Sequence, residues 1–381
     1  MSLNNEQLAQ LAIQIKEWGK ALGFEAVGIS DLDLSEHEQN LKDWLAKRYH
    51  GEMAYMESHG MMRARPQELH PGSVRAISVR MNYLPEHAQF AHTLKQPHKA
   101  YVSRYAIGRD YHKVMRNKLK QLGKKIEQQT ELNVGFRPFV DSAPILERPI
   151  AAKAGLGWVG KHSLILDEEA GSWFFLGELL INLPLPVDQP VKAQCGSCVA
   201  CMTLCPTQAI VAPYQVDANR CISYLTIELQ GEIPVEFRSL IGNRIYGCDD
   251  CQLACPWNRY AELSQETDFS ERHGLLSQDL LSLWQWDEQT FLDNTQGSPI
   301  RRIGYQRWQR NLAVGLGNAD YNEKIIKALT DKLEDSTELV QNHILWAIEQ
   351  QQNKQANQLS TQTKQTKRLV RVVEKGLPRD A

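Results

Sequence analysis

All eight cysteines of this 381-residue chain lie between Cys195 and Cys255, so one compact segment holds every thiol. A disulfide scaffold would distribute its crosslinks over the whole fold. The N-terminal sequence also lacks the basic region and apolar region that together form a signal peptide. We therefore expect reduced thiols that bind metal, in a cytoplasmic protein.

The first cysteine run has the spacing that holds cubane iron–sulfur clusters. Cys195, Cys198, Cys201 and Cys205 form C-x2-C-x2-C-x3-C, and Pro206 follows directly. This is the run of bacterial ferredoxins, in which three closely spaced thiolates bind one cluster. It predicts a 4Fe-4S centre.

The second run predicts another cluster of the same kind. Cys248, Cys251 and Cys255 again end in Cys-Pro but lack the first cysteine of a triplet, and the isolated Cys221 fills that place. In two-cluster ferredoxins the last cysteine of a run binds the other cluster. This rule predicts the following ligand sets: cluster one, Cys195, Cys198, Cys201 and Cys255; cluster two, Cys205, Cys221, Cys248 and Cys251.

Two zinc sites with four cysteines each are the alternative, although two runs that end in Cys-Pro favour iron and sulfide. Either way, the assignment leaves no thiol unused. Electrons that enter two adjacent clusters must therefore reach a different cofactor or substrate.

The rest of the chain divides into a mixed region and a helical region. Helical and strand patterns alternate over 1–190, which predicts an α/β domain, and segments 163–167 and 173–183 are expected to form an antiparallel pair. The cysteine segment, 191–260, is expected to be ferredoxin-like. Amphipathic stretches over 261–350 predict a HEAT-like helical region, and the tail, 351–381, is expected to be basic and flexible.

Basic residues are clustered, although the chain has 43 Lys and Arg against 45 Asp and Glu. The tail and the stretch 98–125 are both rich in Lys and Arg. A third group consists of Arg301, Arg302, Arg307 and Arg310. Any one stretch can be a solvated helix face, but three together favour a phosphate backbone as partner.

Two features are ambiguous without further context. Gly155, Gly157 and Gly160 match G-x-G-x-x-G, but a helix is expected before them and a strand after them, the reverse of a dinucleotide site, so we expect them to let the backbone approach a large flat ligand. Asp141 lies at a strand end before a helix opened by Pro144 and reads as a turn or capping residue. Tyr105, Asp110, Tyr111 and His112 also cluster, but no spacing rule assigns them a role.

Six segments carry a resemblance that covers nearly the whole chain. They are 62–66 (MRARP), 104–112 (RYAIGRDYH), 140–148 (VDSAPILER), 154–161 (AGLGWVGK), 220–228 (RCISYLTIE) and 247–258 (GCDDCQLACPWN). In these segments the chain resembles the epoxyqueuosine reductases, cobalamin-dependent iron–sulfur enzymes of tRNA modification. The resemblance implies an α/β (α+β) cobalamin-binding domain related to reductive dehalogenases, a ferredoxin-like domain with two 4Fe-4S clusters, and a HEAT-like C-terminal region.

The resemblance also implies a reaction and its residues. Two electrons and two protons would convert the epoxide of epoxyqueuosine, at the wobble position of tRNA, to queuosine and water. Asp141 matches the family's proton donor, a role that would need a raised pKa. Contacts to cobalamin are expected from Arg63, Arg104, Tyr105, Asp141, Lys161, His162, Ser163, Tyr224 and Gln252. Contacts to tRNA are expected from the third basic group, Arg301, Arg302, Arg307 and Arg310.

Two other functions remain open at this point. A cobalamin-dependent small-molecule reductase of the reductive dehalogenase type would share the cofactors but would bind tRNA no better than other polyanions. An electron carrier fused to an RNA-binding module would need no cobalamin, and the long region before the cysteines argues against it. For the favoured function we expect a monomer without membrane contact, a flavodoxin or ferredoxin as electron donor, and cobalt without a thiolate ligand.

Overall fold

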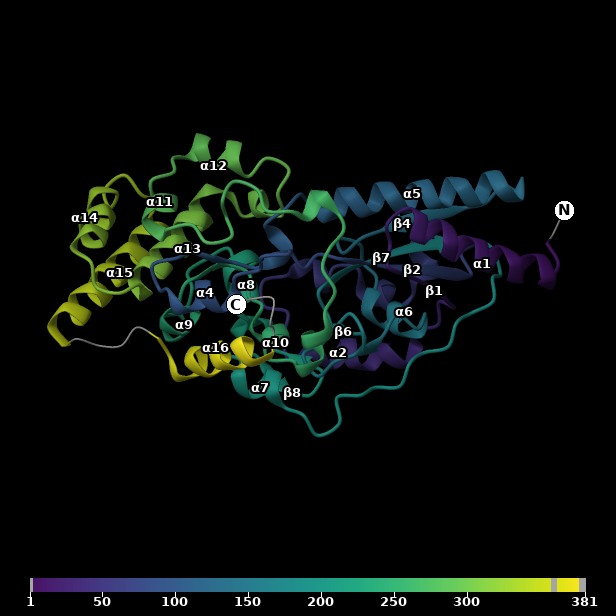
Figure 1. Ribbon diagram of the computed structural model, residues 1–381, viewed down its shortest axis with the longest axis horizontal. Helices are drawn as coiled ribbons and strands as arrows, with labels where there is room; N and C mark the ends of the chain where they lie inside the picture. The colour runs from purple at the N-terminus through teal and green to yellow at the C-terminus, as the bar shows by residue number, and fades with distance from the viewer. Residues whose placement is uncertain (1–2, 358–361, 377–381) are drawn as a thin grey trace.

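The computed structural model describes residues 3–357 and 362–376 (Figure 1). A four-stranded antiparallel sheet in the order β1-β2-β7-β4 forms the centre of the N-terminal region. The strands are β1 (Ala26–Ser30), β2 (Arg75–Asn82), β4 (Phe136–Phe139) and β7 (Phe174–Ile181). The region is therefore α+β, because every pair in this sheet is antiparallel.

Helices cover both faces of this sheet. On one face lie α1 (Asn5–Ala21) and α5 (Tyr111–Thr130), which contact each other and share a core that includes Ile77 and Leu179. On the other face lies α6 (Glu147–Lys153), whose Ile150 packs with Ala76 and Leu180. Since neighbouring strand residues point to opposite faces and both faces are covered, the two middle strands, β2 and β7, are buried almost throughout, polar residues such as Ser78 and Glu178 included.

The expected pairing of 163–167 with 173–183 is wrong. β7 is buried almost along its whole length and pairs with β2 on one side and β4 on the other. β6 (Ile165–Leu166) pairs instead with β5 (Trp158–Val159). A Cβ at Gly157 would lie 2.2 Å from the carbonyl oxygen of Leu166, so this glycine allows close packing within the protein and not the approach of a flat ligand.

The cysteine segment forms a small module of short elements. They are α7 (Ala200–Leu204), β8 (Ile210–Ala212), β9 (Gln215–Val216), α8 (Ile222–Ile227), α9 (Val235–Ile241), β10 (Arg244–Tyr246) and α10 (Asp250–Leu253). β10 pairs in parallel with β3 (Tyr101–Val102), and residues near 100–107 pack into the core of the C-terminal helices. The predicted boundary at 190 therefore does not separate two independent cores.

The C-terminal helices pack around α13 (Gly304–Asn318), which contacts α15 (Glu338–Asn357) along most of its length. Around this pair lie α11 (Leu280–Trp284), α12 (Glu288–Asn294) and α14 (Glu323–Asp331). The remaining helices are α2 (Glu38–Ala46), α3 (Pro66–Leu69) and α4 (Phe90–Lys95). Within the described part of the chain, no helix is both long enough and apolar enough to cross a membrane.

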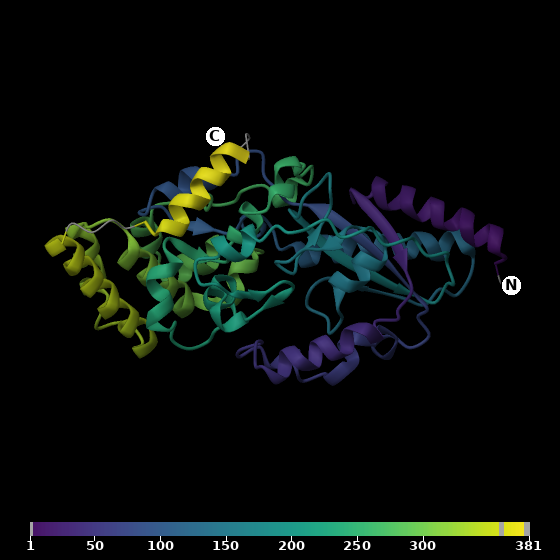
Figure 2. The same cartoon turned by 90° about the horizontal axis from the view of Figure 1, so that it is seen from below.

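The expectation of a flexible tail over 351–381 is wrong for the described residues. α15 continues to Asn357, and α16 (Lys364–Gly376) packs on α4, α7 and α10 (Figures 1 and 2). Leu369, Val370 and Val373 are buried on one side of α16. This apolar stripe holds the helix against the protein, and the basic composition of the segment gives no indication of it.

Candidate active site

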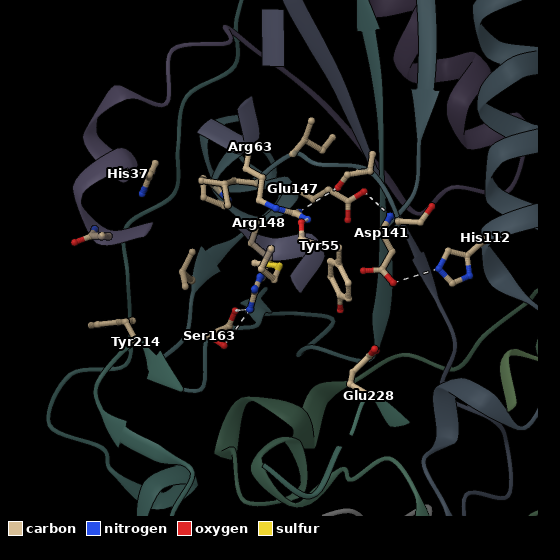
Figure 3. Close-up of a pocket in the computed structure, with 18 of the residues that line it drawn as sticks. His37, Tyr55, Arg63, His112, Asp141, Glu147, Arg148, Ser163, Tyr214 and Glu228 are labelled. Atoms are coloured by element: carbon tan, nitrogen blue, oxygen red, sulfur yellow. Dashed lines mark hydrogen bonds and ion pairs between the residues drawn. The ribbon is translucent and has the colours of Figure 1, made fainter. Parts of the chain in front are cut away.

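Asp141 lies where β4 ends, between the first turns of α5 and α6 (Figure 3). Its φ of +55° is in the left-handed region, which is unfavourable for a residue with a side chain. The Asp141 backbone N–H donates to Oε1 of Glu147 at 2.6 Å. Its Oδ2 accepts from the Tyr111 hydroxyl at 2.8 Å and lies 3.2 Å from Nε2 of His112.

The charges around Asp141 favour its ionised form. Burial raises the pKa of Asp141, but the hydrogen bond and charge of His112, together with the Tyr111 hydroxyl, outweigh that effect and lower it. Burial lowers the pKa of His112, whereas Asp110 and Asp141 raise it, with a net value of about 9. The expectation of a raised pKa for Asp141 is therefore wrong.

Glu147 is the second proton-holding group beside Asp141. Burial, and then the charge of Asp141, raise the pKa of Glu147 to about 8. At neutral pH the site thus holds protons on His112 and Glu147, while Asp141 carries a negative charge between them.

Asp141 lies in the wall of three adjoining cavities. The Asp141 cavity has a volume of about 780 Å³ and is lined by Tyr55, Arg63, His112 and Glu147, among others (Figure 3). Arg302 also lines it. The cysteine cavity, of about 440 Å³, is lined by Cys205, Cys221, Cys248 and Cys251. A side cavity of about 370 Å³ includes Tyr105, Tyr224 and Glu228. Arg148 also borders all three, so Asp141 and Arg148 lie in a wall between the Asp141 cavity and the cysteine cavity.

The eight thiols form two adjoining groups. Burial and, to a smaller extent, the charges of the nearby Cys195, Cys201 and Cys198 raise the pKa of Cys255 to about 12. The other four thiols line the cysteine cavity together. Thiols are the donors that iron–sulfur clusters require, and the two ligand sets stay a prediction that this proximity supports.

Seven of the nine residues predicted to bind cobalamin line the cavities. They are Arg63, Tyr105, Asp141, His162, Ser163, Tyr224 and Gln252. Arg104 does not, because it is buried beneath Phe90 and Tyr101 and donates to two backbone carbonyls. Lys161 does not either, because its Nζ donates to the carbonyls of Gly196 and Cys198. The structure therefore contradicts the prediction for these two residues.

His162 indicates that the cysteine cavity fits a bound group. It is 4% exposed, and its Nδ1 accepts the backbone N–H of Leu164 at 3.1 Å. Burial lowers the pKa of His162 to about 4, so the neutral ring carries its proton on Nε2, which has no partner among the described atoms. Phe174, Leu176 and Ile165 add apolar walls. A large ring with amide side chains, such as a corrin, would supply both apolar contact and the missing acceptor.

The four arginines predicted to bind RNA lie in different environments. Arg302 lines the Asp141 cavity and pairs with Glu228, and Arg301 is exposed. Arg307 is partly buried and donates to the carbonyl of Ile227. Arg310 is fully buried on the inner face of α13, where it donates to three carbonyls, so its predicted contact with RNA is wrong.

His112, Glu147 and Arg148 line the cavity although no sequence pattern assigns them a role. His112 was part of a noted cluster, and Asp110 caps the start of α5 two residues earlier. Glu147 and Arg148 end the same motif that contains Asp141. The motif that Glu147 and Arg148 share with Asp141 could have indicated a role for them. Only the fold shows that these side chains and His112 line the same cavity.

Comparisons with known proteins agree with this geometry. Residues 63–142 match the family model described as epoxyqueuosine reductase QueG, DUF1730, and residues 194–258 match a 4Fe-4S double cluster binding domain. The epoxyqueuosine reductase of Vibrio cholerae is 62% identical over 372 residues, which cover 98% of this chain and 99% of the relative. The domain match favours iron–sulfur clusters over the zinc alternative.

Two solved structures have the same fold over nearly the whole chain. One is an epoxyqueuosine reductase with an epoxyqueuosine-modified tRNA stem loop, with a TM-score of 0.82, 26% identity, and coverage of 97% of this chain and 99% of that chain. The other is the Bacillus subtilis epoxyqueuosine reductase with its catalytic aspartate loop swung out of the active site. It has a TM-score of 0.81 and 25% identity, and the match covers 96% of this chain and 98% of that chain.

Proposed function

The chain belongs to the epoxyqueuosine reductase family, and on that premise we propose that it reduces the epoxide of epoxyqueuosine in tRNA to queuosine. Two 4Fe-4S clusters and cobalamin are its cofactors. The observation that carries the proposal is the position of Asp141, in a wall shared by the Asp141 cavity of about 780 Å³ and a cavity lined by four cysteines. A small-molecule reductase is not favoured, because the relatives that match nearly the whole chain are epoxyqueuosine reductases.

The predicted ligand sets assign each cluster four thiols of this chain. Cobalamin would be held by the cysteine cavity, with His162 Nε2 as a donor and Tyr105, Ser163 and Gln252 in the surrounding walls. When bound, these groups would supply two electrons to the substrate one at a time. No thiol is left over to bind cobalt.

The residues around Asp141 supply the protons. Nε2 of His112 gives a proton to Oδ2 of Asp141, 3.2 Å away, and Asp141 gives it to the oxygen that leaves the epoxide. Because the pKa of Asp141 is low, its protonated form is a strong acid for this transfer. With two electrons and a second proton, the epoxide becomes an alkene and its oxygen becomes water.

Glu147 positions this acid. The relative from Bacillus subtilis has its catalytic aspartate loop outside the active site. In this chain Oε1 of the Glu147 carboxyl group accepts the backbone N–H of Asp141 and so keeps the loop inside. The loop can therefore occupy two positions, and Glu147 stabilises the inner one.

The anticodon nucleotide enters the Asp141 cavity, where Arg302 and Arg63 provide positive charge. Arg301 and Arg307 remain proposed contacts to the RNA backbone. We place the protein in the cytoplasm, as a monomer that takes electrons from a flavodoxin or ferredoxin, because eight free thiols require a reducing compartment.

Binding of tRNA tests this function against the small-molecule alternative. The reconstituted enzyme should bind an epoxyqueuosine-modified anticodon stem loop more tightly than the same stem loop with unmodified guanine, at one fixed salt concentration. Equal affinity for both stem loops and for an unrelated polyanion would contradict the proposal.

A further inference from the structure

α16 presents a basic stripe to solvent. Lys364, Lys367, Arg368, Arg371 and Lys375 are all exposed and recur at helical spacing. The opposite side of the helix is the buried stripe that includes Leu369 and Val373. The single acid, Glu374, pairs with Lys95 of α4, so the exposed face has a strong positive charge.

This stripe lies directly on the cluster-binding module. α16 contacts α7, which carries Cys201, and α10, which carries Cys251. Its last residue, Gly376, fits against Arg259, because a Cβ there would lie 3.1 Å from Nε of that arginine. Arg259 is exposed and follows Cys255 by four residues, so the stripe continues onto the loop of cluster one.

Cluster one is also the cluster closest to solvent. Of the eight thiols, Cys198 is the exposed one. Val199 beside it is 45% exposed, and Tyr260 beside Arg259 is 65% exposed. Electron transfer weakens steeply with distance, so an external donor must dock beside an exposed ligand loop of this kind. Small apolar contacts surrounded by charge are typical of weak, short-lived complexes.

The stripe faces away from the Asp141 cavity. Asn40 of α2 lines that cavity, and Figure 2 shows α16 (yellow, at the top) and α2 (violet, at the bottom) on opposite sides of the molecule. An RNA whose anticodon enters the Asp141 cavity therefore approaches from the other side. This separation favours a protein partner over RNA at the basic stripe.

We propose that the exposed face of α16, with Arg259 and Tyr260, is the docking surface for a small acidic protein that carries one electron at a time. This inference rests on the proposed function, which requires an electron donor. Each docked carrier loses one electron to cluster one and is oxidised by one electron. Two dockings therefore supply the two electrons that, with two protons, convert one epoxide to an alkene and water.

Charge reversal on α16 tests the docking surface. The holoenzyme with Arg368→Glu and Arg371→Glu is compared with a control of equal charge change, Lys20→Glu and Lys324→Glu, at exposed positions on α1 and α14. Stopped-flow spectroscopy follows oxidation of a reduced flavodoxin or ferredoxin, and titration of the labelled carrier by NMR measures binding without turnover. At low ionic strength the α16 variant should lose about tenfold in the bimolecular rate constant and bind the carrier more weakly, and high salt should remove the difference.

Further measurements distinguish the possible failures. With dithionite as reductant, the α16 variant should turn over at the wild-type rate and bind tRNA normally. A wild-type carrier rate in this variant, or a loss of tRNA affinity with an unchanged carrier rate, would overturn the proposal. Arg368→Gln with Arg371→Gln gives a milder change if the reversed helix unfolds, and should reduce the rate less. A wild-type enzyme that binds the carrier but never reduces epoxyqueuosine with dithionite would contradict the proposed function and not the docking surface.

Discussion

The backbone N–H of Asp141 donates a 2.6 Å hydrogen bond to Oε1 of Glu147, six residues later in the chain. This bond holds Asp141 at a φ of +55°, where its carboxylate meets His112 and Tyr111. A left-handed conformation at a residue with a side chain costs about 1–3 kcal/mol and persists only when its surroundings compensate for that cost. Glu147 is therefore part of what keeps the proposed acid in the site.

Replacement of Glu147 should separate this positioning role from its charge. Glu147→Ala removes the acceptor, and loss of such a bond costs about 1–3 kcal/mol, so single-turnover rates should fall by about tenfold or more. Glu147→Gln keeps an acceptor oxygen and should recover most of the rate, but without the pH dependence near 8 that the carboxyl group provides. Equal loss in both variants would contradict the positioning role of this hydrogen bond.

Removal of the proposed acid should stop chemistry without affecting binding. Asp141→Asn cannot relay a proton, so turnover should fall by about 100-fold or more while iron content and stem-loop affinity stay unchanged. The pKa of His112 should also fall, because one of its two carboxylate partners is lost. NMR titration of labelled His112 measures this change, and an active variant would remove Asp141 from the role.

Activity should decrease at alkaline pH. The raised pKa of His112 means that its attraction to the carboxylates is fully present below its ordinary pKa and is lost as pH rises through about 9. Glu147 loses its proton earlier, near pH 8. Single-turnover rates should therefore be steady at neutral pH and decline in two overlapping steps. In His112→Gln the later step should be absent, and an unchanged profile would contradict the proton relay.

The double-cluster segment and the chain's family were predictable from sequence because they depend on local spacing. Cys-x2-Cys runs that end in Cys-Pro indicate a cluster from their local spacing alone. The direction of a long side chain such as that of Arg310 depends on the fold around it. Arg302 and Arg310 belong to one basic group in the sequence, yet helical geometry directs the first to the cavity and the second into the core. The predicted contact of Arg104 with cobalamin is wrong for the same reason, because its side chain points into the protein.

The pKa of Asp141 could not be predicted either. Burial alone raises the pKa of a carboxyl group, and the sequence supported that expectation. The opposing effect comes from His112, 29 residues earlier, which reaches Asp141 only because α5 starts beside the end of β4. Similarly, the basic composition of α16 predicts a flexible tail, whereas the burial of one side of this helix depends on contacts with α4, α7 and α10.

Two arginines of the same basic group should respond differently to mutation. Arg310→Ala leaves the carbonyls of Leu225, Leu229 and Gly231 without their donor, so it should reduce the free energy of unfolding by about 3 kcal/mol or more. Arg301→Ala, at the surface, should change stability by about 0.5 kcal/mol or less. Denaturant unfolding measures both, and equal effects would contradict the buried role of Arg310.

Loss of one thiol should affect one cluster only. Cys221→Ser removes a ligand from the predicted cluster two, next to the cysteine cavity, and leaves the four predicted ligands of cluster one intact. Bound iron should fall by about half or less, and EPR of the reduced protein should lose the interaction between two neighbouring clusters. Complete loss of both clusters in a folded protein would contradict the separate ligand sets.

The most direct test is mass spectrometry of tRNA nucleosides from a strain that lacks this protein, before and after anaerobic incubation with the reconstituted enzyme, cobalamin and a reductant. The predicted result is epoxyqueuosine before incubation and queuosine after it, with no conversion by Asp141→Asn. Normal queuosine in the deletion strain, or epoxyqueuosine that persists with the fully loaded wild-type enzyme, would contradict the proposed function.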